Sequence, residues 1–284
     1  MDFALTAEQE MLRKSVREFA EVEIKPKVEN MDETGMVPMD ILEKMAKLGF
    51  MGVMVPREYG GLGMGHIART IMLEEIGRIS AAMANTLQII HLGISPIVTD
   101  GTEEQKKKWL PLLARGEKLS TFAVTEPTGG SDVLGIQTTA KLQGDEYFMS
   151  GRKCFITNSH LAGVLGIVAR TGEGTKGLTA FIVESDFPGF RPGREENKFG
   201  LRGCNTGELV LENCRVPKEN VIGKEGDGLR IALSTISNVG RPGITCAALG
   251  IIDSCLEAAV RYSKQRILYG KPISELQAIQ WNLT

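Results

Sequence analysis

The spacing of apolar positions predicts that the chain begins with a series of amphipathic helices. Thr6 and Gln9 have the spacing of a capping box, and apolar residues follow at helical intervals until Pro26. The same pattern predicts further helices over residues 39–49, 67–76, 81–90 and 102–116, the last opened by a second capping box. The apolar face of the helix over 39–49 is predicted to consist of Leu42, Met45 and Leu48.

A different pattern begins near Ser120, where short runs of β-branched and aromatic residues alternate with turn residues. The runs cover residues 122–125, 147–149, 154–157, 164–169, 178–183 and 209–211. Turn residues such as Asp145, Gly151 and Gly172 separate them. This pattern predicts a small antiparallel β domain in the middle of the chain.

The helical period returns after Gly228, where one apolar stripe advances by alternating steps of four and three residues. Its members are Ile244, Ala248, Ile251, Cys255, Ala258 and Tyr262. That spacing is typical of a seam between packed helices. Because a bundle needs more helices than this region supplies, we expect the sequence to be the N-terminal part of a longer protein. A short protein that obtains the missing helices by oligomerising is the alternative.

These patterns together predict an α+β fold in three parts. An N-terminal α-helical domain would cover residues 1–118, and an antiparallel, β-barrel-like domain would cover residues 119–227. Residues 228–284 would hold the first helices of an incomplete C-terminal bundle. A length of 284 residues suits one large or two ordinary domains, with a third present only in part.

Composition and charge narrow the class of protein. Hydrophobic residues make up 42% and charged residues 24%, which is typical of a globular protein and excludes disordered and collagen-like classes. The net charge is -2 and the pI is about 6.0, so nucleic acid and anionic membrane surfaces are poor partners. The sequence has no run of about 18 apolar residues and no signal-peptide pattern at its start, so we expect no membrane span.

Cysteine and histidine spacing argues against a disulfide framework and a metal site. The five cysteines are an odd number without a CxxC pair, which fits a reducing cytoplasm. His66, His91 and His160 lie far apart in the sequence and share no metal-ligand spacing. We therefore expect no bound metal.

Two segments of the β region carry candidate chemistry. A strand leads to Thr125 and breaks at Pro127, and two glycines then expose backbone amides before the hydroxyl of Ser131. Such a loop can bind a phosphate or an extended polar ligand, although it could also be an ordinary polar turn. Phe155 and Thr157 place an aromatic face beside a hydroxyl, which can flank a flat heteroaromatic ring; a core aromatic is the alternative.

Five segments in a shared order resemble the acyl-CoA dehydrogenase family. They are PREYGGLG (56–63), GTEEQKKKWLP (101–111), TEPTGGSD (125–132), GRKCFITN (151–158) and RYSKQRILYGKPISELQAIQ (261–280). The resemblance implies an FAD-dependent enzyme that oxidises an acyl-CoA thioester to a 2,3-enoyl-CoA. It also implies that electrons pass to an electron-transfer flavoprotein and that the chain forms a homo-oligomer, either a tetramer or a dimer.

The resemblance further implies which residues contact FAD. The backbone from Phe122 to Ser131 would follow the flavin, and Phe155 would stand where the family often has a tryptophan that packs on the ring. The residues implied in one subunit are Phe122, Val124, Thr125, Gly130, Ser131, Phe155, Ile156 and Thr157. Arg266, Tyr269 and Gln277 would reach FAD bound by a neighbouring subunit. Arginine suits a pyrophosphate because its planar fork is bidentate and permanently charged.

For the substrate, the resemblance implies contacts from both the β region and the helices. The residues concerned are Ser131, Asn238, Arg241, Gln88 and His91. If Gln88 and His91 point inward, they would favour a polar or aromatic acyl group. The family places its glutamate base late in the C-terminal bundle or on the helix that holds Gly240. Here the second position is glycine and the first lies beyond Thr284, so no acid in the sequence matches a known base position.

Several other functions remain open at this point. A flavin-dependent relative of the same fold could be an acyl-CoA oxidase, an enoyl-CoA reductase or a monooxygenase. A short chain could also bind FAD or acyl-CoA without catalysis, and the pI of about 6.0 argues against the DNA-associated members of the fold. The expected location is the cytoplasm, or the mitochondrial matrix if a transit peptide was removed.

Overall fold

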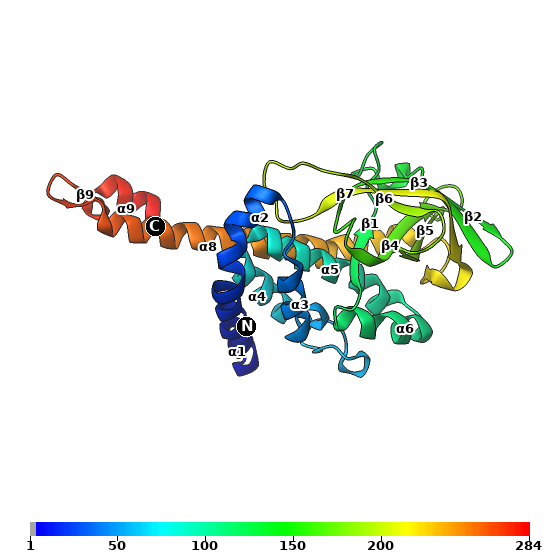
Figure 1. The fold of residues 1–284 in the computed structure, drawn as a ribbon, viewed down its shortest axis with the longest axis horizontal. Coiled ribbons are helices and arrows are strands. Elements are labelled where there is room, and N and C mark those ends of the chain that lie inside the picture. The colour runs from blue at the N-terminus through cyan, green and yellow to red at the C-terminus, as the bar shows by residue number, and fades with distance from the viewer. Residues whose placement is uncertain (1–3) are drawn as a thin grey trace.

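The computed structural model describes residues 4–284, and it confirms the predicted α+β order of helices, sheet and helices (Figure 1). The N-terminal helices are α1 (Ala7–Phe19), α2 (Val28–Thr34), α3 (Met39–Lys47), α4 (Gly65–Gly77), α5 (Ala81–Asp100) and α6 (Glu103–Ala114). The main sheet contains β1 (Leu119–Ala123), β2 (Thr139–Gln143), β3 (Glu146–Thr157), β4 (Ala162–Arg170), β5 (Leu178–Glu184), β6 (Phe190–Glu195), β7 (Thr206–Pro217) and β8 (Val221–Ile222). The C-terminal elements are α7 (Gly228–Thr235), a π-helical turn (Ile236–Gly240), α8 (Arg241–Gln265), β9 (Ile267–Leu268), β10 (Lys271–Pro272) and α9 (Gln277–Leu283).

Both predicted capping boxes are present. The Thr6 hydroxyl accepts the Gln9 backbone N–H over 3.2 Å, and the Gln9 side chain accepts the Thr6 N–H over 3.0 Å. Thr102 and Gln105 make the same reciprocal pair at the start of α6. The Gln105 amide also donates to the Val221 carbonyl over 2.8 Å, so this cap fastens α6 to β8.

Two details of the helix prediction are wrong. Leu48 is 52% exposed because α3 ends at Lys47 and leaves Leu48 in the following turn. Helix α5 also continues well beyond residue 90, through Gly93 and Pro96, which usually weaken helices. Tertiary packing explains the glycine, since a Cβ at Gly93 would lie 2.6 Å from the backbone nitrogen of Thr121. Helix α5 therefore lies directly against the backbone of β1.

The main sheet is mostly antiparallel, but the prediction of an antiparallel domain misses two parallel contacts. The order of neighbouring strands is β6-β7-β3-β2-β4-β5-β8, and β1 pairs with β4 in parallel from Leu119 to Ala123. Strand β2 also meets β4 in parallel at Thr139. Parallel strands need a connecting segment that brings the chain back to the same end of the sheet, and β3, which follows β2 in a hairpin, provides it between β2 and β4.

Predicted strands 147–149 and 154–157 are two halves of the single strand β3. Strands β2 and β6 were not predicted, because their sequences are rich in polar residues and most of their side chains are exposed. Strand β6 lies at the edge of the sheet and carries Arg191, Arg194 and Glu195, charges that natural edge strands commonly use against aggregation.

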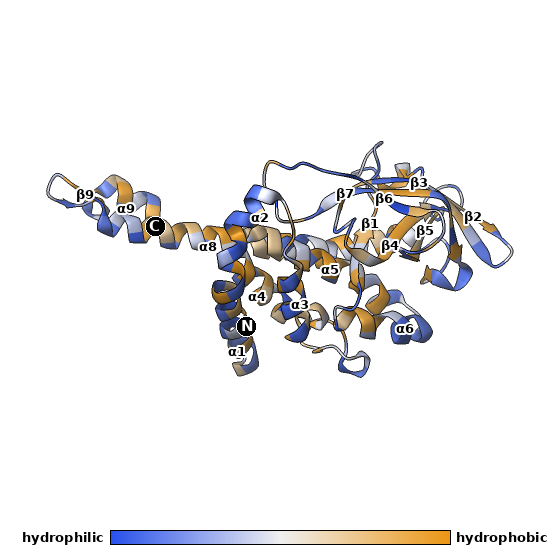
Figure 2. Cartoon of the chain, viewed as in Figure 1, coloured by the Kyte–Doolittle hydropathy of each residue, from blue (hydrophilic) through white to orange (hydrophobic). Residues whose placement is uncertain are grey.

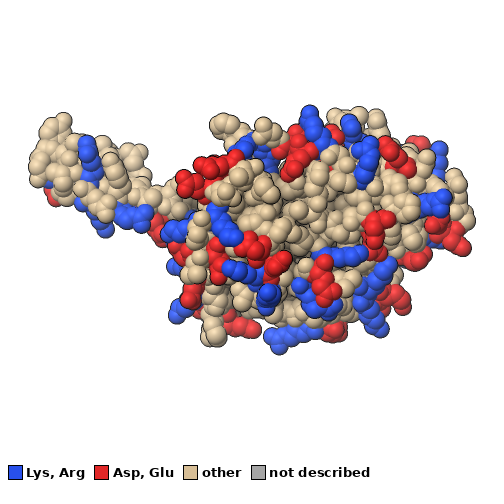
Figure 3. Space-filling view, viewed as in Figure 1, with Lys and Arg blue, Asp and Glu red and all other residues tan. Residues whose placement is uncertain are grey.

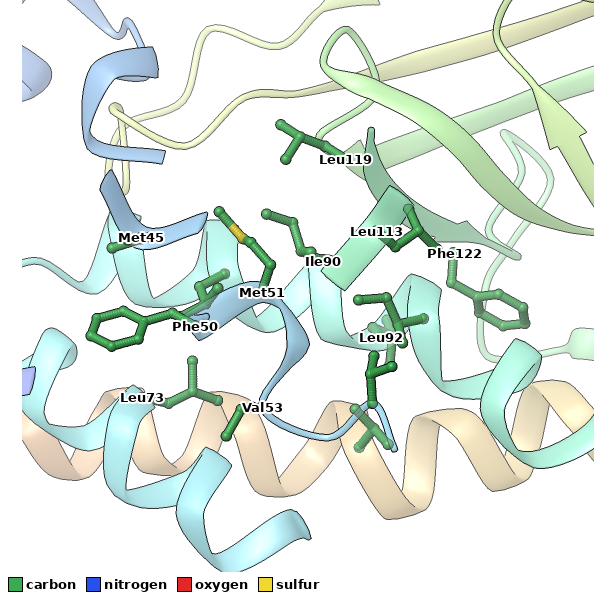
Figure 4. Close-up of a cluster of buried hydrophobic side chains, with 14 of the residues drawn as sticks. Met45, Phe50, Met51, Val53, Leu73, Ile90, Leu92, Leu113, Leu119 and Phe122 are labelled. Carbon is green, nitrogen blue, oxygen red and sulfur yellow. The ribbon is translucent and has the colours of Figure 1, made fainter. Parts of the chain in front are cut away.

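The main hydrophobic core lies where α5 meets the sheet and the neighbouring helices. Figure 4 shows Ile90 and Leu92 of α5 gathered with Leu113 of α6 and with Leu119 and Phe122 of β1. All of these side chains are buried. The core therefore fixes α5, which carries Gln88 and His91, relative to the end of β1, which leads into the loop that holds Thr125.

Helix α8 begins in the body of the protein and then projects from it as an arm that ends in α9 (Figure 1). Its buried residues are Gly243, Ala247, Gly250 and Ser263. At Gly250 a Cβ would lie 2.3 Å from the Glu74 carbonyl oxygen, so α8 and α4 approach through residues without bulky side chains. All six residues of the apolar stripe predicted from Ile244 to Tyr262 are exposed. Figure 2 shows hydrophobic residues along the projecting part of α8.

By length and composition, two helical stretches could cross a membrane, Ala81–Asp100 and Gly228–Gln265. The apolar window of the first is 78% buried inside the protein, as in the core helix of a folded domain, whereas that of the second is only 17% buried. Such helices are weak indicators of a membrane span. On the face shown in Figure 3, basic and acidic side chains are interspersed over the body, so that face has no field of a single sign.

Candidate active site

The loop after β1 and the middle of β3 lie side by side and present the residues expected to bind a flavin. The Cys154 backbone N–H donates to the Thr125 carbonyl over 3.0 Å. The Lys153 ammonium donates to the Val124 carbonyl over 3.1 Å. These bonds join two motifs that are about thirty residues apart in the sequence, so the structure brings both into one surface.

A β-bulge in β3 pushes Phe155 out of the sheet. The pairing of β3 with β7 shifts register between Lys153 and Ile156. Phe155 has a φ of 56°, in the left-handed region that bulky residues rarely adopt, and it is 66% exposed, whereas Ile156 is buried. The alternative of a core aromatic is therefore wrong. A strained, exposed aromatic at a bulge indicates a surface that receives a ligand.

The loop of residues 125–131 presents unpaired polar groups next to the end of β1. Glu126 and Gly129 exchange backbone hydrogen bonds of 3.0 and 3.1 Å, which close a tight turn. A Cβ at Gly130 would lie 3.0 Å from the Thr125 hydroxyl oxygen, so the loop folds back closely over Thr125. Within residues 4–284, the Thr125 hydroxyl and the amides of Gly130 and Ser131 have no hydrogen-bond partner. They can therefore bind polar atoms of a ligand.

Behind this loop lies a buried ion pair. Lys153 Nζ and Glu126 Oε1 are 2.8 Å apart, and the two side chains are 0% and 4% exposed. The same carboxylate accepts the backbone N–H groups of Gln137 and Thr138 over 2.7 and 3.0 Å. Burial opposes ionisation of Glu126, but the charge and hydrogen bond of Lys153 outweigh it and hold the pKa of Glu126 below its usual value. Burial lowers the pKa of Lys153 to about 8, so both groups are charged at neutral pH.

Residues expected to contact the substrate come from α5 and the start of α8. Gln88 is buried, and its amide donates to the Gly240 carbonyl over 2.9 Å. Asn238 and Arg241 are exposed at the nearby π-helical turn, and Arg241 lies 3.4 Å from the Ser237 hydroxyl. Pro242, which has no N–H group, disrupts regular helical hydrogen bonding here and explains the wide turn. Wide turns of this kind are frequent at functional sites.

His91 points inward from α5 but contacts a different neighbour from Gln88. Its Nε2 lies 2.9 Å from the Phe50 carbonyl oxygen, so Nε2 carries the proton and donates. Burial, followed by the charge of Arg69, lowers the pKa of His91 to about 3. The neutral ring leaves Nδ1 as a buried acceptor without a hydrogen-bond partner in the described chain.

The residues expected to reach a neighbouring subunit lie apart from this site. Arg266 and Tyr269 follow the end of α8, and Gln277 begins α9, so all three are at the outer end of the arm (Figure 1). All are exposed, Tyr269 to 93%. The structure does not bring them to the Phe155 surface of their own chain, and their exposure leaves them able to contact a second chain.

The side chains at the Phe155 surface fit a flavin cofactor, with three corrections. Phe155 offers an open aromatic face, and Thr125 and Gly130 offer unpaired polar groups at its side. Phe122, however, is buried against Gly166, where a Cβ would lie 2.5 Å from the Phe122 ring. Val124 and Ile156 are buried as well, so these three residues can reach a ligand only through their backbones.

Comparison with known proteins identifies the family of the chain. Family models described as the acyl-CoA dehydrogenase N-terminal, middle and C-terminal domains match residues 6–117, 121–214 and 226–284. An acyl-CoA dehydrogenase of Bacillus subtilis is 45% identical over 98% of this chain and 74% of its own length. An acryloyl-CoA reductase (NADH) of Anaerotignum propionicum is 44% identical over 99% of this chain and 72% of its own. The chain belongs to the acyl-CoA dehydrogenase family.

Solved structures give the same result and extend it to the cofactor. Butyryl-CoA dehydrogenase of Megasphaera elsdenii superimposes with a TM-score of 0.96 at 38% identity, covering 100% of this chain and 76% of that one. An acyl-CoA dehydrogenase of Bacillus anthracis, solved with FAD, has a TM-score of 0.91 at 37% identity, covering 98% of this chain and 49% of that one. The protein is accordingly an FAD-dependent oxidoreductase that acts on the CH–CH group of acyl-CoA thioesters.

Three features near the site were not predicted from the sequence. The Lys153–Glu126 pair lies within the recognised motifs, but nothing in the spacing shows that both side chains are buried together. Asn158 ends the same motif and donates to the Thr86 carbonyl over 3.1 Å, which ties β3 to α5. Arg69 looks like a polar residue on an amphipathic helix, yet it is fully buried. Only the tertiary structure reveals these roles.

Proposed function

We propose that the flavin lies on the surface formed by Phe155 and the loop of residues 125–131, with the thioester between that surface and the start of α8. The exposed Phe155 ring in its left-handed conformation is the single observation that carries this placement. The Thr125 hydroxyl and the amides of Gly130 and Ser131 bind the polar edge of the flavin. Asn238 and Arg241 bind the CoA chain at the mouth of the site, together with Ser131.

The chemistry is removal of two hydrogens from adjacent carbons of the acyl group. Bound FAD supplies the acceptor for the hydride that leaves the β carbon. A base must take the proton from the α carbon, which the thioester carbonyl acidifies. Gly240 offers no side chain at one of the positions where the family carries this base, so we expect a carboxylate from another part of the protein to serve. The ion pair behind the loop holds the backbone in place and does not exchange protons with the substrate.

The direction of the reaction is the finer part of the proposal. We favour oxidation of an acyl-CoA to a 2,3-enoyl-CoA, with electron-transfer flavoprotein as acceptor. The 45% identity with an acyl-CoA dehydrogenase supports this direction. A caffeyl-CoA reductase-Etf complex subunit of Acetobacterium woodii, 40% identical over 96% of this chain, supports the flavoprotein partner. Together with the acryloyl-CoA reductase, it also favours enoyl-CoA reduction as the second candidate.

Steady-state assays in both directions test the proposal. With electron-transfer flavoprotein as acceptor, the full-length, FAD-loaded protein should convert an acyl-CoA to its 2,3-enoyl-CoA. Turnover only with enoyl-CoA and a reduced donor would assign the reductase direction instead. Rapid oxygen consumption with acyl-CoA would indicate an oxidase.

We further propose that the protein works as a homo-oligomer in the cytoplasm. The exposed stripe of α8 and the exposed Arg266 support the oligomer, because both lie on an arm that extends away from the chain's own body (Figure 1). Bacterial relatives support the cytoplasmic location. Sedimentation of the FAD-loaded protein distinguishes a tetramer from a dimer and from a monomer.

A further inference from the structure

Arg69 is a fully buried arginine without a counterion. It lies on α4 and is 0% exposed, and within residues 4–284 no carboxylate is in salt-bridge contact with it. Its Nη2 donates to the Val239 carbonyl over 2.9 Å. The Nε and Nη1 atoms are buried and have no hydrogen-bond partner in the described chain. Burial lowers the pKa of this guanidinium to about 10, so it remains charged at neutral pH.

Two unpaired acceptor atoms lie near the unpaired nitrogens of Arg69. Gln88 and His91 lie on α5, and both Gln88 Oε1 and His91 Nδ1 are buried without a hydrogen-bond partner in the described part of the chain. A Cβ at Gly243 would lie 2.3 Å from Arg69 Nη2 and 2.5 Å from Gln88 Cγ, so both side chains lie against the same turn of α8. Arg69 and Gln88 therefore present unsatisfied polar atoms under the start of α8, and His91 adds another buried acceptor one turn further along α5.

Such an arrangement is costly for folding alone. A buried charge normally has a partner, and a buried donor or acceptor left unpaired loses its hydration without compensation. Buried polar groups that the fold leaves unsatisfied call for a specific explanation. A ligand that brings a negative charge and oxygen acceptors would provide both the missing counterion and the missing hydrogen bonds.

The location of Arg69 indicates which ligand that is. The elements expected to surround the acyl group are α5, through Gln88 and His91, and the π-helical turn before α8. Arg69 lies between these elements, because it bonds Val239 of the turn and contacts Gly243 together with Gln88. Asn238 and Arg241, by contrast, are exposed at the mouth, where the CoA chain would enter. Arg69 is therefore buried beneath this turn on the side of Gln88, whereas the residues assigned to the CoA chain lie on the exposed side of the turn.

We propose that Arg69 is a specificity-determining residue that binds a carboxylate carried by the acyl group. The substrate would then be an acyl-CoA whose acyl chain bears a second, free carboxylate, held by Arg69 with Gln88 at its side. This inference rests on the proposed function, since it concerns the acyl end of the same thioester site. The carboxylate is not altered by the reaction and is bound in the same way in substrate and product. Arg69 therefore orients the substrate and takes no part in bond breaking.

Matched pairs of thioesters test this assignment. The full-length, FAD-loaded protein is mixed anaerobically with pentanoyl-CoA or glutaryl-CoA, and with hexanoyl-CoA or adipoyl-CoA, and the loss of oxidised-flavin absorption is followed. We expect the carboxylated member of each pair to reduce the flavin at least about 30-fold more efficiently than the plain member, because a buried charge pair contributes that much to affinity. Arg69→Met should abolish this preference, and Arg69→Lys should retain part of it.

Controls separate recognition from folding. Arg115→Met, at an exposed arginine that forms an ion pair with exposed Glu117, should leave the preference unchanged. Without ligand, Arg69→Met should melt at the same or a higher temperature than the wild type, because it removes an uncompensated buried charge. The carboxylated thioester should raise the melting temperature of the wild type more than that of Arg69→Met.

The outcomes distinguish this inference from the proposed function. If plain and carboxylated thioesters reduce the flavin equally well, or if Arg69→Met keeps the wild-type preference, the role of Arg69 is overturned while the proposed function stands. If none of the thioesters reduces the flavin, the proposed function fails and this inference fails with it.

Discussion

Lys153 donates a hydrogen bond of 2.8 Å to Glu126 in a fully buried ion pair directly behind the loop that we assign to the flavin. The ammonium also donates to the Val124 carbonyl, and the carboxylate accepts the amides of Gln137 and Thr138. The pair therefore links β3 to the residue after β1 and to the residues that lead into β2.

Removing one member of the pair should loosen the loop and destabilise the protein. Lys153→Met leaves the Glu126 carboxylate buried without its counterion, which we expect to cost about 3 to 5 kcal/mol of the free energy of unfolding. Retention of FAD through gel filtration should fall as well. Urea denaturation and the flavin-to-protein ratio measure the two effects, and Lys141→Met on exposed β2 is the control. Wild-type stability in Lys153→Met would refute a structural role for the pair.

Phe155 should affect flavin binding and stability in opposite directions. Phe155→Gly relieves a positive φ and should stabilise the protein by about 1 kcal/mol. It also removes the aromatic face, so the dissociation constant of FAD should rise roughly 10-fold. Phe155→Trp should bind FAD at least as tightly as the wild type. Unchanged FAD affinity in Phe155→Gly would show that the ring does not stack on the flavin.

His91 should make the protein sensitive to acid. Its pKa is about 3 in the folded protein, below the usual value of 6.5, so the unfolded chain takes up the proton first as the pH falls. Stability should therefore decrease from about pH 6.5 down to about pH 3, by up to about 1.4 kcal/mol per pH unit from this group. His91→Gln should flatten the profile, and exposed His66→Gln should not. A profile that His91→Gln leaves unchanged would contradict the burial of a neutral imidazole.

Arg266 tests the contribution of a neighbouring subunit. Arg266→Ala should lower the flavin-to-protein ratio after gel filtration, because a bidentate cation for the pyrophosphate is lost. Lys264→Ala, on the same exposed stretch of α8, is the matched control. The effect should disappear under dilution that dissociates the oligomer, where wild type and variant lose FAD alike. An unchanged ratio in Arg266→Ala would refute the pyrophosphate role.

The sequence predicted the elements better than it predicted their environment. Capping boxes at Thr6 and Thr102 and the change of hydrophobic period at Ser120 located most helices and strands, because these signals are local. Helix α5 was cut short because the packing of Gly93 against β1 is a tertiary effect. The parallel pairing of β1 with β4 was missed for the same reason, since it joins segments far apart in the chain.

The candidate site shows the same division. The family motifs identified the loop and Phe155, whereas the bulge that exposes Phe155 appears only when β3 is paired with β7. Burial shows which residues can contact a ligand through their side chains. Phe122, Val124 and Ile156 are buried, so they can contact it only through their backbone atoms. Arg69 belongs to no motif, and it becomes informative only because its guanidinium is buried and has no carboxylate partner within residues 4–284.

The central claim is that this protein oxidises acyl-CoA thioesters with FAD bound at the Phe155 surface. Its most direct test is the absorption of the oxidised flavin during anaerobic addition of a panel of plain, branched, aromatic and carboxylated acyl-CoA thioesters to the full-length, FAD-loaded protein. We predict that at least one thioester bleaches the flavin absorption and yields the corresponding 2,3-enoyl-CoA. Retention of the full oxidised absorption with every thioester would contradict the account.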